Sequence, residues 1–135
     1  MKKQYLKEIL VDEYADLPEP MLVNKTLNVW EKNDGGLKES RFKSKKKRGD
    51  CVIRAIALAT DISYDKVFDD LCDVAKETGF LPNQEETFEP YLASLGWRKN
   101  KPQRMGRCLV PLEMFNSRGK TSIVRVRRHL VTVKD

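Results

Sequence analysis

The chain has 135 residues, of which 40% are hydrophobic and 34% are charged, a composition that suits one compact domain and argues against two large independent cores. Its formal net charge of +6 favours acidic partners. No apolar run approaches the roughly 20 residues of a membrane-spanning helix, and the polar start does not resemble a signal peptide. We therefore expect a cytoplasmic protein with three free cysteines.

The charge is unevenly distributed along the chain. Residues 1–37 carry a net charge of −2, residues 38–54 of +6, residues 55–95 of −7 and residues 96–135 of +9. The positive charge therefore lies in two separate stretches, with an acidic segment between them.

The N-terminal third differs from the rest. We expect residues 1–45 to form an extension that wraps a core domain of residues 46–135, with Trp30 docked on that core because a free tail rarely carries so much apolar surface. In the run Lys38–Arg48, seven of eleven residues are basic. Such a run is either a solvated loop or a contact surface for nucleic acid or an acidic protein.

Two helices are predicted in the middle of the chain. Residues 51–60 are almost entirely apolar and form a buried helix with Asp50 as its N-cap. A second helix follows the cap Ser63 and ends at Gly79, with acidic residues on one face. Cys72 lies on its apolar stripe and is expected in the core.

The end of the chain combines a third helix with strands. The helix is predicted over residues 87–95, with Pro90 in its first turn. Residues 121–135 predict two strands that bend near Arg127, which makes the fold class α+β. The helix residues expected to face inward are Phe88, Tyr91, Leu92 and Leu95.

Cys51 and His129 are the candidate catalytic pair. A helix N-terminus and nearby positive charge both favour the thiolate, which is the reactive form of cysteine. An imidazole from the terminal strands would then serve as the general base and would later protonate the leaving group.

These residues resemble a known arrangement. The order of Gly49-Asp50-Cys51 at a helix start, an acidic helix, Leu95-Gly96-Trp97 and a β-hairpin with His129 is similar to small papain-like cysteine peptidases of bacteriophages. The resemblance covers residues 49–134. It implies a papain-like fold with N-terminal helices packed on a small antiparallel sheet, a protein or peptide substrate, no cofactor and a place in the host cytoplasm. It also implies Cys51 as nucleophile and His129 as base.

Two parts of the papain-like site are missing. Such enzymes usually orient the histidine with an Asn or Asp on a later strand, and only Asp135 is available after His129. The usual oxyanion donor is a Gln before the cysteine; here Lys45 stands near that position. Because each loss can cost orders of magnitude in rate, a weak or lost activity is one expectation.

A non-catalytic papain-like module that binds an acidic host or viral partner is therefore the first alternative. The basic residues near both candidate catalytic residues would bind such an anionic partner. These residues are Lys43, Lys45, Lys46, Lys47, Arg48, Arg127 and Arg128.

The second alternative is a nucleic-acid-binding protein, in which Trp97 would stack on a base beside cationic contacts to phosphate. The cations are Arg98, Lys99, Lys101, Arg104 and Arg107. No metal is expected, since the cysteines and His129 contain no closely spaced ligand pair.

Overall fold

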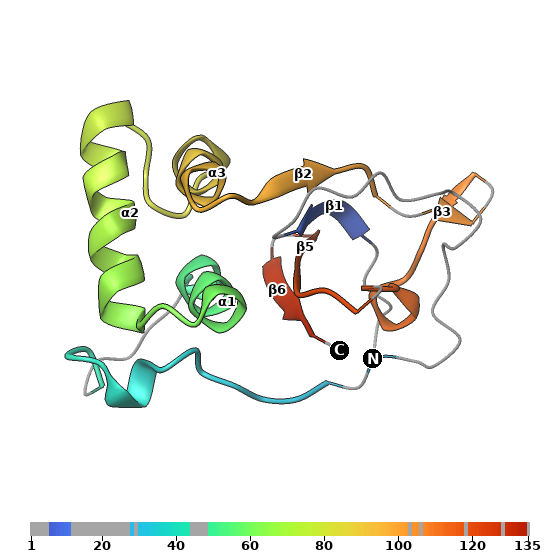
Figure 1. Cartoon of the computed structure of the whole chain (residues 1–135), viewed down its shortest axis with the longest axis horizontal. Helices are drawn as coiled ribbons and strands as arrows, with labels where there is room; N and C mark the ends of the chain where they lie inside the picture. The colour runs from blue at the N-terminus through green and yellow to red at the C-terminus, as the bar shows by residue number, and fades with distance from the viewer. Residues whose placement is uncertain are drawn as a thin grey trace.

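The computed structural model describes residues 6–11, 28, 30–43, 49–102, 104–105, 107–117, 119–127 and 129–134 (Figure 1). Its helices are the short 3-10 turn η2 (Leu37–Glu39), α1 (Cys51–Thr60), α2 (Tyr64–Thr78), α3 (Glu85–Ser94) and the 3-10 turn η3 (Leu112–Met114). Its strands are β1 (Leu6–Val11), β2 (Arg98–Asn100), β3 (Arg104–Met105), β4 (Cys108–Leu109), β5 (Ser122–Val126) and β6 (His129–Val133). The α+β class is confirmed.

Four strands form one antiparallel sheet in the order β2-β1-β5-β6, and β3 pairs with β4 as a separate hairpin. β1 is an inner strand that pairs with both β2 and β5. The expected N-terminal extension therefore does not simply wrap the core, because residues 6–11 complete its main sheet. A single short strand gives no recognisable pattern until its partners are known.

α1 and α2 form where their patterns predict them. The Ser63 hydroxyl accepts a hydrogen bond from the Lys66 N–H at the start of α2, and Gly79 ends that helix in the left-handed conformation. Cys72, expected in the core, is only half-buried. Within the described ranges, no helix is long and apolar enough to span a membrane.

α3 begins two residues earlier than expected, at Glu85, so Pro90 lies beyond the first turn. Phe88, Tyr91 and Leu92 are buried as predicted, whereas Leu95 is 41% exposed because it already follows the helix end. The expectation that Trp30 docks on the core is wrong, since 69% of this residue is exposed.

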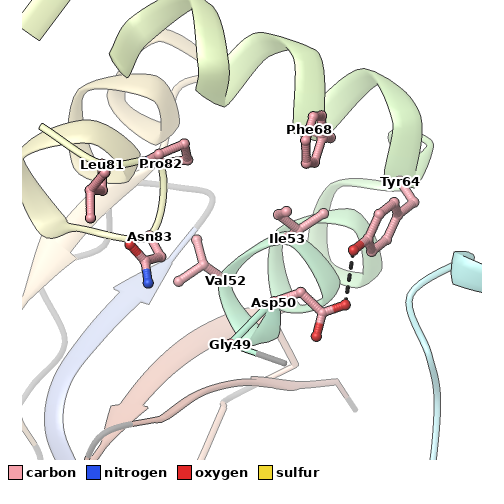
Figure 2. A pocket seen from close by; sticks show the side chains of 9 residues that line it. All are labelled: Gly49, Asp50, Val52, Ile53, Tyr64, Phe68, Leu81, Pro82 and Asn83. Carbon is pink, nitrogen blue, oxygen red and sulfur yellow. Dashed lines mark hydrogen bonds between the residues drawn. The ribbon is translucent and has the colours of Figure 1, made fainter. Parts of the chain in front are cut away.

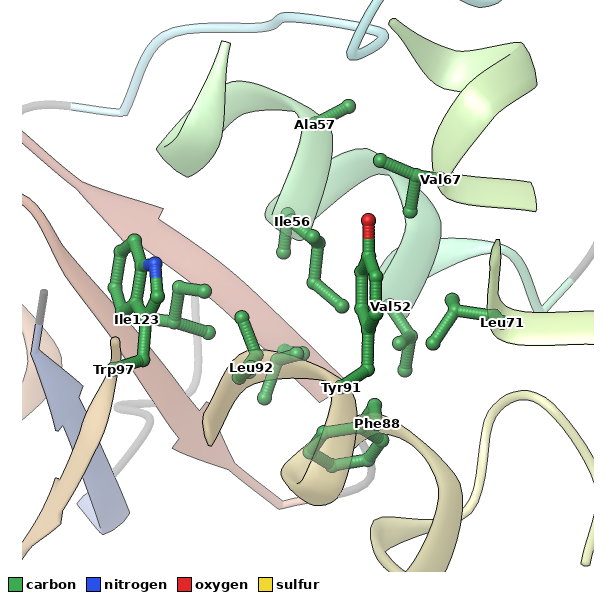
Figure 3. Packing of buried hydrophobic residues seen from close by; sticks show 12 residues of the cluster. Val52, Ile56, Ala57, Val67, Leu71, Phe88, Tyr91, Leu92, Trp97 and Ile123 are labelled. Carbon is green, nitrogen blue, oxygen red and sulfur yellow. The ribbon is translucent and has the colours of Figure 1, made fainter. Parts of the chain in front are cut away.

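The sheet separates two hydrophobic clusters. One face packs against the three α-helices through residues such as Ile123 and Leu130, and this larger cluster also buries Trp97 (Figure 3). The other face carries Val124, Val126, Val131 and Val133, which pack against Val110 and Phe115 from the β4–η3 region. The helices and the β3–β4 hairpin therefore lie on opposite sides of the sheet (Figure 1).

Ser122 is fully buried at the start of β5, and its hydroxyl has no hydrogen-bond partner among the described residues. A buried polar group without a partner is destabilising. We therefore expect Ser122→Ala to raise the free energy of unfolding by about 1 kcal/mol, measured by urea denaturation. Ser40, whose buried hydroxyl donates to the Leu37 carbonyl, provides the control: Ser40→Ala should destabilise. A clear loss of stability in Ser122→Ala would contradict the expectation.

Candidate functional site

α1 lies on the sheet in the same direction as β6. Near the middle of both elements, the Thr132 hydroxyl donates a 2.6 Å hydrogen bond to the Ala55 carbonyl. Beyond their C-terminal ends, Lys134 Nζ lies 3.8 Å from a carboxylate oxygen of Asp61. The start of α1 and the start of β6 therefore lie at the same end of the molecule.

Cys51 is on the side of α1 that faces β6, because it lies one helical turn before Ala55. One turn back along a helix is about 5.4 Å, and two residues back along a strand are about 6.6 Å. Cys51 is four residues before Ala55, and Leu130 is two residues before Thr132. Because these two steps are of similar length, Cys51 lies level with Leu130. The Cys51 side chain is half-buried and packs against the hydrophobic cluster that contains Leu130.

His129 begins β6 and pairs with Val126 across the β5–β6 hairpin. Cross-strand partners share a face, so the half-buried His129 side chain belongs to the face of Val126, away from α1. Within the described residues, β6 is one of the two edge strands of the sheet. The fold thus brings the backbones of Cys51 and His129 to the same end, and a contact between their side chains requires the imidazole to turn around the edge of β6.

Asp50 occupies the N-cap position of α1, but its side chain does not cap the helix. Its Oδ2 accepts one hydrogen bond from the Tyr64 hydroxyl at 2.8 Å (Figure 2). It accepts another from Arg54 Nε at 2.9 Å. The Asp50 carboxylate therefore points toward Tyr64 at the start of α2 instead of toward the first turn of α1. The N–H groups of the first turn of α1, beside Cys51, are consequently not covered by the Asp50 side chain.

Tyr64 is a firm hydrogen-bond donor in this arrangement. Burial raises the pKa of its phenol far above the ordinary value, and the hydrogen bond to Asp50 raises it further. The tyrosine therefore keeps its proton at neutral pH, and Asp50 acts as the acceptor. This pair joins the residue immediately before Cys51 to the start of α2.

A pocket of about 260 Å³ opens beside the start of α1 (Figure 2). Most of its wall is apolar, and Leu81, at its edge, is 64% exposed. The pocket is formed by α1, α2 and the α2–α3 link and is of a size to hold an apolar side chain. Sequence reasoning missed it, although the apolar run Phe80-Leu81-Pro82 between the two helices was a signal. The lining residues are Gly49, Asp50, Val52, Ile53, Tyr64, Phe68, Leu81, Pro82 and Asn83.

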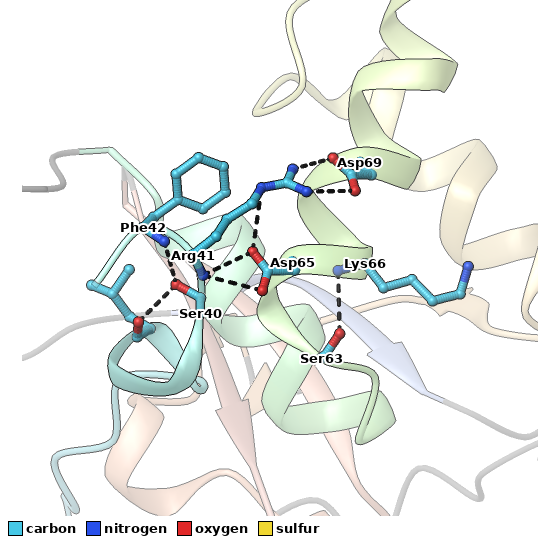
Figure 4. Close-up of polar contacts among 8 residues, drawn as sticks. Ser40, Arg41, Phe42, Ser63, Asp65, Lys66 and Asp69 are labelled. Atoms are coloured by element: carbon cyan, nitrogen blue, oxygen red, sulfur yellow. Dashed lines mark hydrogen bonds and ion pairs between the residues drawn. The ribbon is translucent and has the colours of Figure 1, made fainter. Parts of the chain in front are cut away.

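Arg41, from the first basic stretch, is bound to α2 (Figure 4). Its backbone N–H donates to the Asp65 carboxylate, and its guanidinium forms an ion pair with Asp69. The hydrogen bond from Arg41 lowers the pKa of Asp69. The neighbouring Phe42 ring packs 4.5 Å from the ring of Phe68. Arg41 is therefore neutralised within the protein.

Gly35 fixes the chain that leads to this contact. It has φ +65°, and a Cβ at this position would lie 2.7 Å from the Cα of Arg54. Only glycine combines this backbone conformation with so close an approach to α1. Residues 35–43 are thus held against both α1 and α2 before the chain enters the residues that precede Cys51.

The structure describes only two of the basic residues that were predicted to bind an anionic partner. Lys43 and Arg127 are exposed. The oxyanion candidate Lys45 lies outside the described residues, as do Lys46, Lys47, Arg48 and Arg128. Asp135, the one acid that follows His129, lies outside them as well. Among the residues that the structure describes, His, Cys, Asp and Glu form no group of three or more that could hold a metal ion.

Trp97 is 7% exposed and lies in the cluster beneath the helices (Figure 3). The expectation that it stacks on a nucleic-acid base is therefore wrong. Trp97 follows the end of α3, where its backbone N–H donates to the Leu92 carbonyl, and its ring is buried in the same cluster as Leu92.

No family model, no curated protein and no solved structure matches this chain.

Proposed function

We propose that the chain is a papain-like cysteine hydrolase of peptidase or isopeptidase type, with Cys51 as nucleophile and His129 as base. One observation carries the proposal: α1 and β6 run in the same direction and are joined at Ala55 and Thr132, so that Cys51 and His129 both begin their elements at one end of the molecule. A cysteine at a helix start and a histidine at the start of the strand beneath it are the two parts that this chemistry needs.

In the proposed reaction, the Cys51 thiol loses its proton to the His129 imidazole, and the sulfur attacks the carbonyl carbon of a peptide or isopeptide bond. The resulting oxyanion accepts hydrogen bonds from N–H groups of the first turn of α1, which the Asp50 side chain leaves uncovered. His129 protonates the leaving amine as the carbon–nitrogen bond breaks. Water, deprotonated by the same imidazole, then releases the acyl group from sulfur.

The pocket beside α1 would supply substrate binding in this scheme. Its apolar wall is connected to Cys51 through the adjacent residues Asp50 and Val52, and the exposed Leu81 extends it along the surface. A substrate with an apolar side chain next to the cleaved bond fits this environment best. We expect turnover to be slow, because a resting imidazole on the far side of β6 must first turn toward the sulfur.

A non-catalytic papain-like interaction module is the second candidate, and one observation favours it. The pairing of His129 with Val126 assigns the imidazole to the sheet face that does not carry α1. In that arrangement the exposed Lys43 and Arg127 would contribute to binding an acidic protein partner, and Cys51 would have only a packing role.

Thiol labelling distinguishes the two candidates. Cys51 is half-buried and Cys108 is exposed, so exposure alone makes Cys108 the faster thiol. If His129 activates Cys51, then iodoacetamide should modify Cys51 faster than Cys108 at pH 6.5, as measured by peptide mass spectrometry. His129→Ala should slow the labelling of Cys51 about tenfold or more and leave Cys108 unchanged.

Cys72 provides an internal control, since it is half-buried and lies on α2. Labelling in the order of exposure alone, with no effect of His129→Ala, would refute the proposed catalytic pair and leave the interaction module as the better explanation.

A further inference from the structure

The second basic stretch forms a surface of its own, away from the helices. Lys101, Arg104 and Arg107 follow β2 and continue through the β3–β4 hairpin, and all three are exposed. Figure 1 shows β3 on the opposite side of the sheet from α1, α2 and α3. This surface is therefore separate from the pocket beside α1.

The strand register adds Arg127 to this surface. Across β1 and β5, Asn100 of β2 is level with Val131 of β6, and the residues after Asn100 continue toward the end of the sheet where β6 begins. Arg127, in the β5–β6 turn, is exposed at that same end. We call Lys101, Arg104, Arg107 and Arg127 the basic end of the sheet.

These four cations have no carboxylate partner among the described residues, in contrast to Arg41, Lys99 and Arg125, which pair with acids of the helical layer. Residues 90–112 contain five Lys and Arg and no Asp or Glu. Within the part of the chain that the structure describes, the Arg104 guanidinium donates one hydrogen bond, at 3.3 Å, to the backbone carbonyl of Arg107. The positive charge of this end is therefore left for an external anion.

The chemistry of the surface favours a nucleic-acid duplex over a protein or a single strand. Protein interfaces need an apolar centre, and the exposed large apolar residues in the described part of the chain, Trp30, Phe80, Leu81 and Leu95, all lie outside the basic end. Single-strand binding relies on aromatic stacking platforms, and the neighbouring Trp97 is buried. Phosphate binding needs only exposed cations, for which a protruding hairpin is well suited.

We propose that the basic end of the sheet binds the phosphate backbone of a DNA or RNA duplex without sequence specificity. Duplex binding does not depend on the thiol of Cys51 or on the proposed hydrolase chemistry, although Arg127 lies two residues before His129 at the same end of the sheet. Through the basic end of the sheet, the protein would be held on a nucleic acid while the pocket beside α1, on the other side of the sheet, remains accessible to a protein.

The test measures binding of a fluorescein-labelled 20-base-pair DNA duplex and the matching RNA duplex between 50 and 200 mM NaCl. With about four phosphate contacts, log K should fall against log salt with a slope of about −3.6. Arg104→Gln combined with Arg107→Gln should weaken binding at least about tenfold at 50 mM and reduce the slope by about 1.8. Lys66→Gln with Lys76→Gln, the matched change of charge on α2, should leave both unchanged.

Three results would overturn the proposal: no duplex binding at 50 mM NaCl, an equal loss in the α2 control, or tighter binding to polyglutamate or to single strands than to duplexes. Cys51→Ala should bind the duplex like the wild-type chain. Loss of hydrolysis and loss of duplex binding are therefore separately observable.

Discussion

Replacing Cys51 by Ala should abolish hydrolysis of a fluorogenic peptide-amide library, lowering kcat/KM by about 10³-fold or more. The reason is that no other described cysteine starts a helix: Cys72 lies within α2 and Cys108 in the β4 strand. The acyl-enzyme route has no substitute nucleophile once the thiol is removed. The measurement is the initial rate at enzyme concentrations high enough to detect slow turnover.

Cys72→Ala and Cys108→Ala are the matched controls and should retain the wild-type rate within about twofold. Since the rate is expected to be low, each preparation should also be checked for folding by circular dichroism. A wild-type chain without turnover, or a Cys51→Ala variant as active as the wild type, would contradict the hydrolase proposal.

Asp50→Ala should lower the free energy of unfolding by about 2–3 kcal/mol. The side chain of Asp50 is only 11% exposed, and its removal leaves both the Tyr64 hydroxyl and the Arg54 guanidinium without their shared acceptor. The cost is moderated because Arg54 is one-third exposed and can turn to water. Urea denaturation measures the effect, and Asp73→Ala, at an exposed position of α2, should change stability by less than about 0.5 kcal/mol.

Tyr64→Phe removes the hydroxyl that donates this hydrogen bond and should lower the free energy of unfolding by about 1–2 kcal/mol. The free energy of unfolding of the double variant should fall by less than the sum of the two single losses, since the shared hydrogen bond can be lost only once. Additive effects would show that the two residues are not coupled.

The folded pKa of Tyr64 is above its unfolded value of about 10, so the stability from this burial is present below pH 10 and is lost as the pH rises above it. Tyr64→Phe should therefore be less sensitive to alkaline unfolding.

Local patterns predicted the helical part of the fold well. α1 and α2 lie where apolar periodicity and the Ser63 and Gly79 signals place them, and the β5–β6 hairpin lies where alternation predicts it. β1 and the short strands β2, β3 and β4 were missed, because two to six residues do not show a period without their partners. The burial of Trp97 was missed for the same reason.

The candidate site was predictable in part. Cys51 does begin a helix and His129 does begin a strand, both of which follow from local sequence signals. The direction of the Asp50 side chain was not predictable, because its acceptor role depends on Tyr64, fourteen residues away, rather than on the N–H groups beside it. The pocket beside α1 likewise needs three segments to meet.

Composition and charge predicted a single domain with two basic stretches around an acidic segment, and the helix and strand patterns predicted the α+β class. Only the tertiary structure decided how those charges are used. It pairs Arg41 with acids of α2, places the β3–β4 hairpin, which carries Arg104 and Arg107, on the far side of the sheet, and sets His129 on a particular face of β6. The physical reason is that charge and periodicity are local properties, whereas pairing partners, strand register and the face of a sheet are set by contacts between residues far apart in the chain.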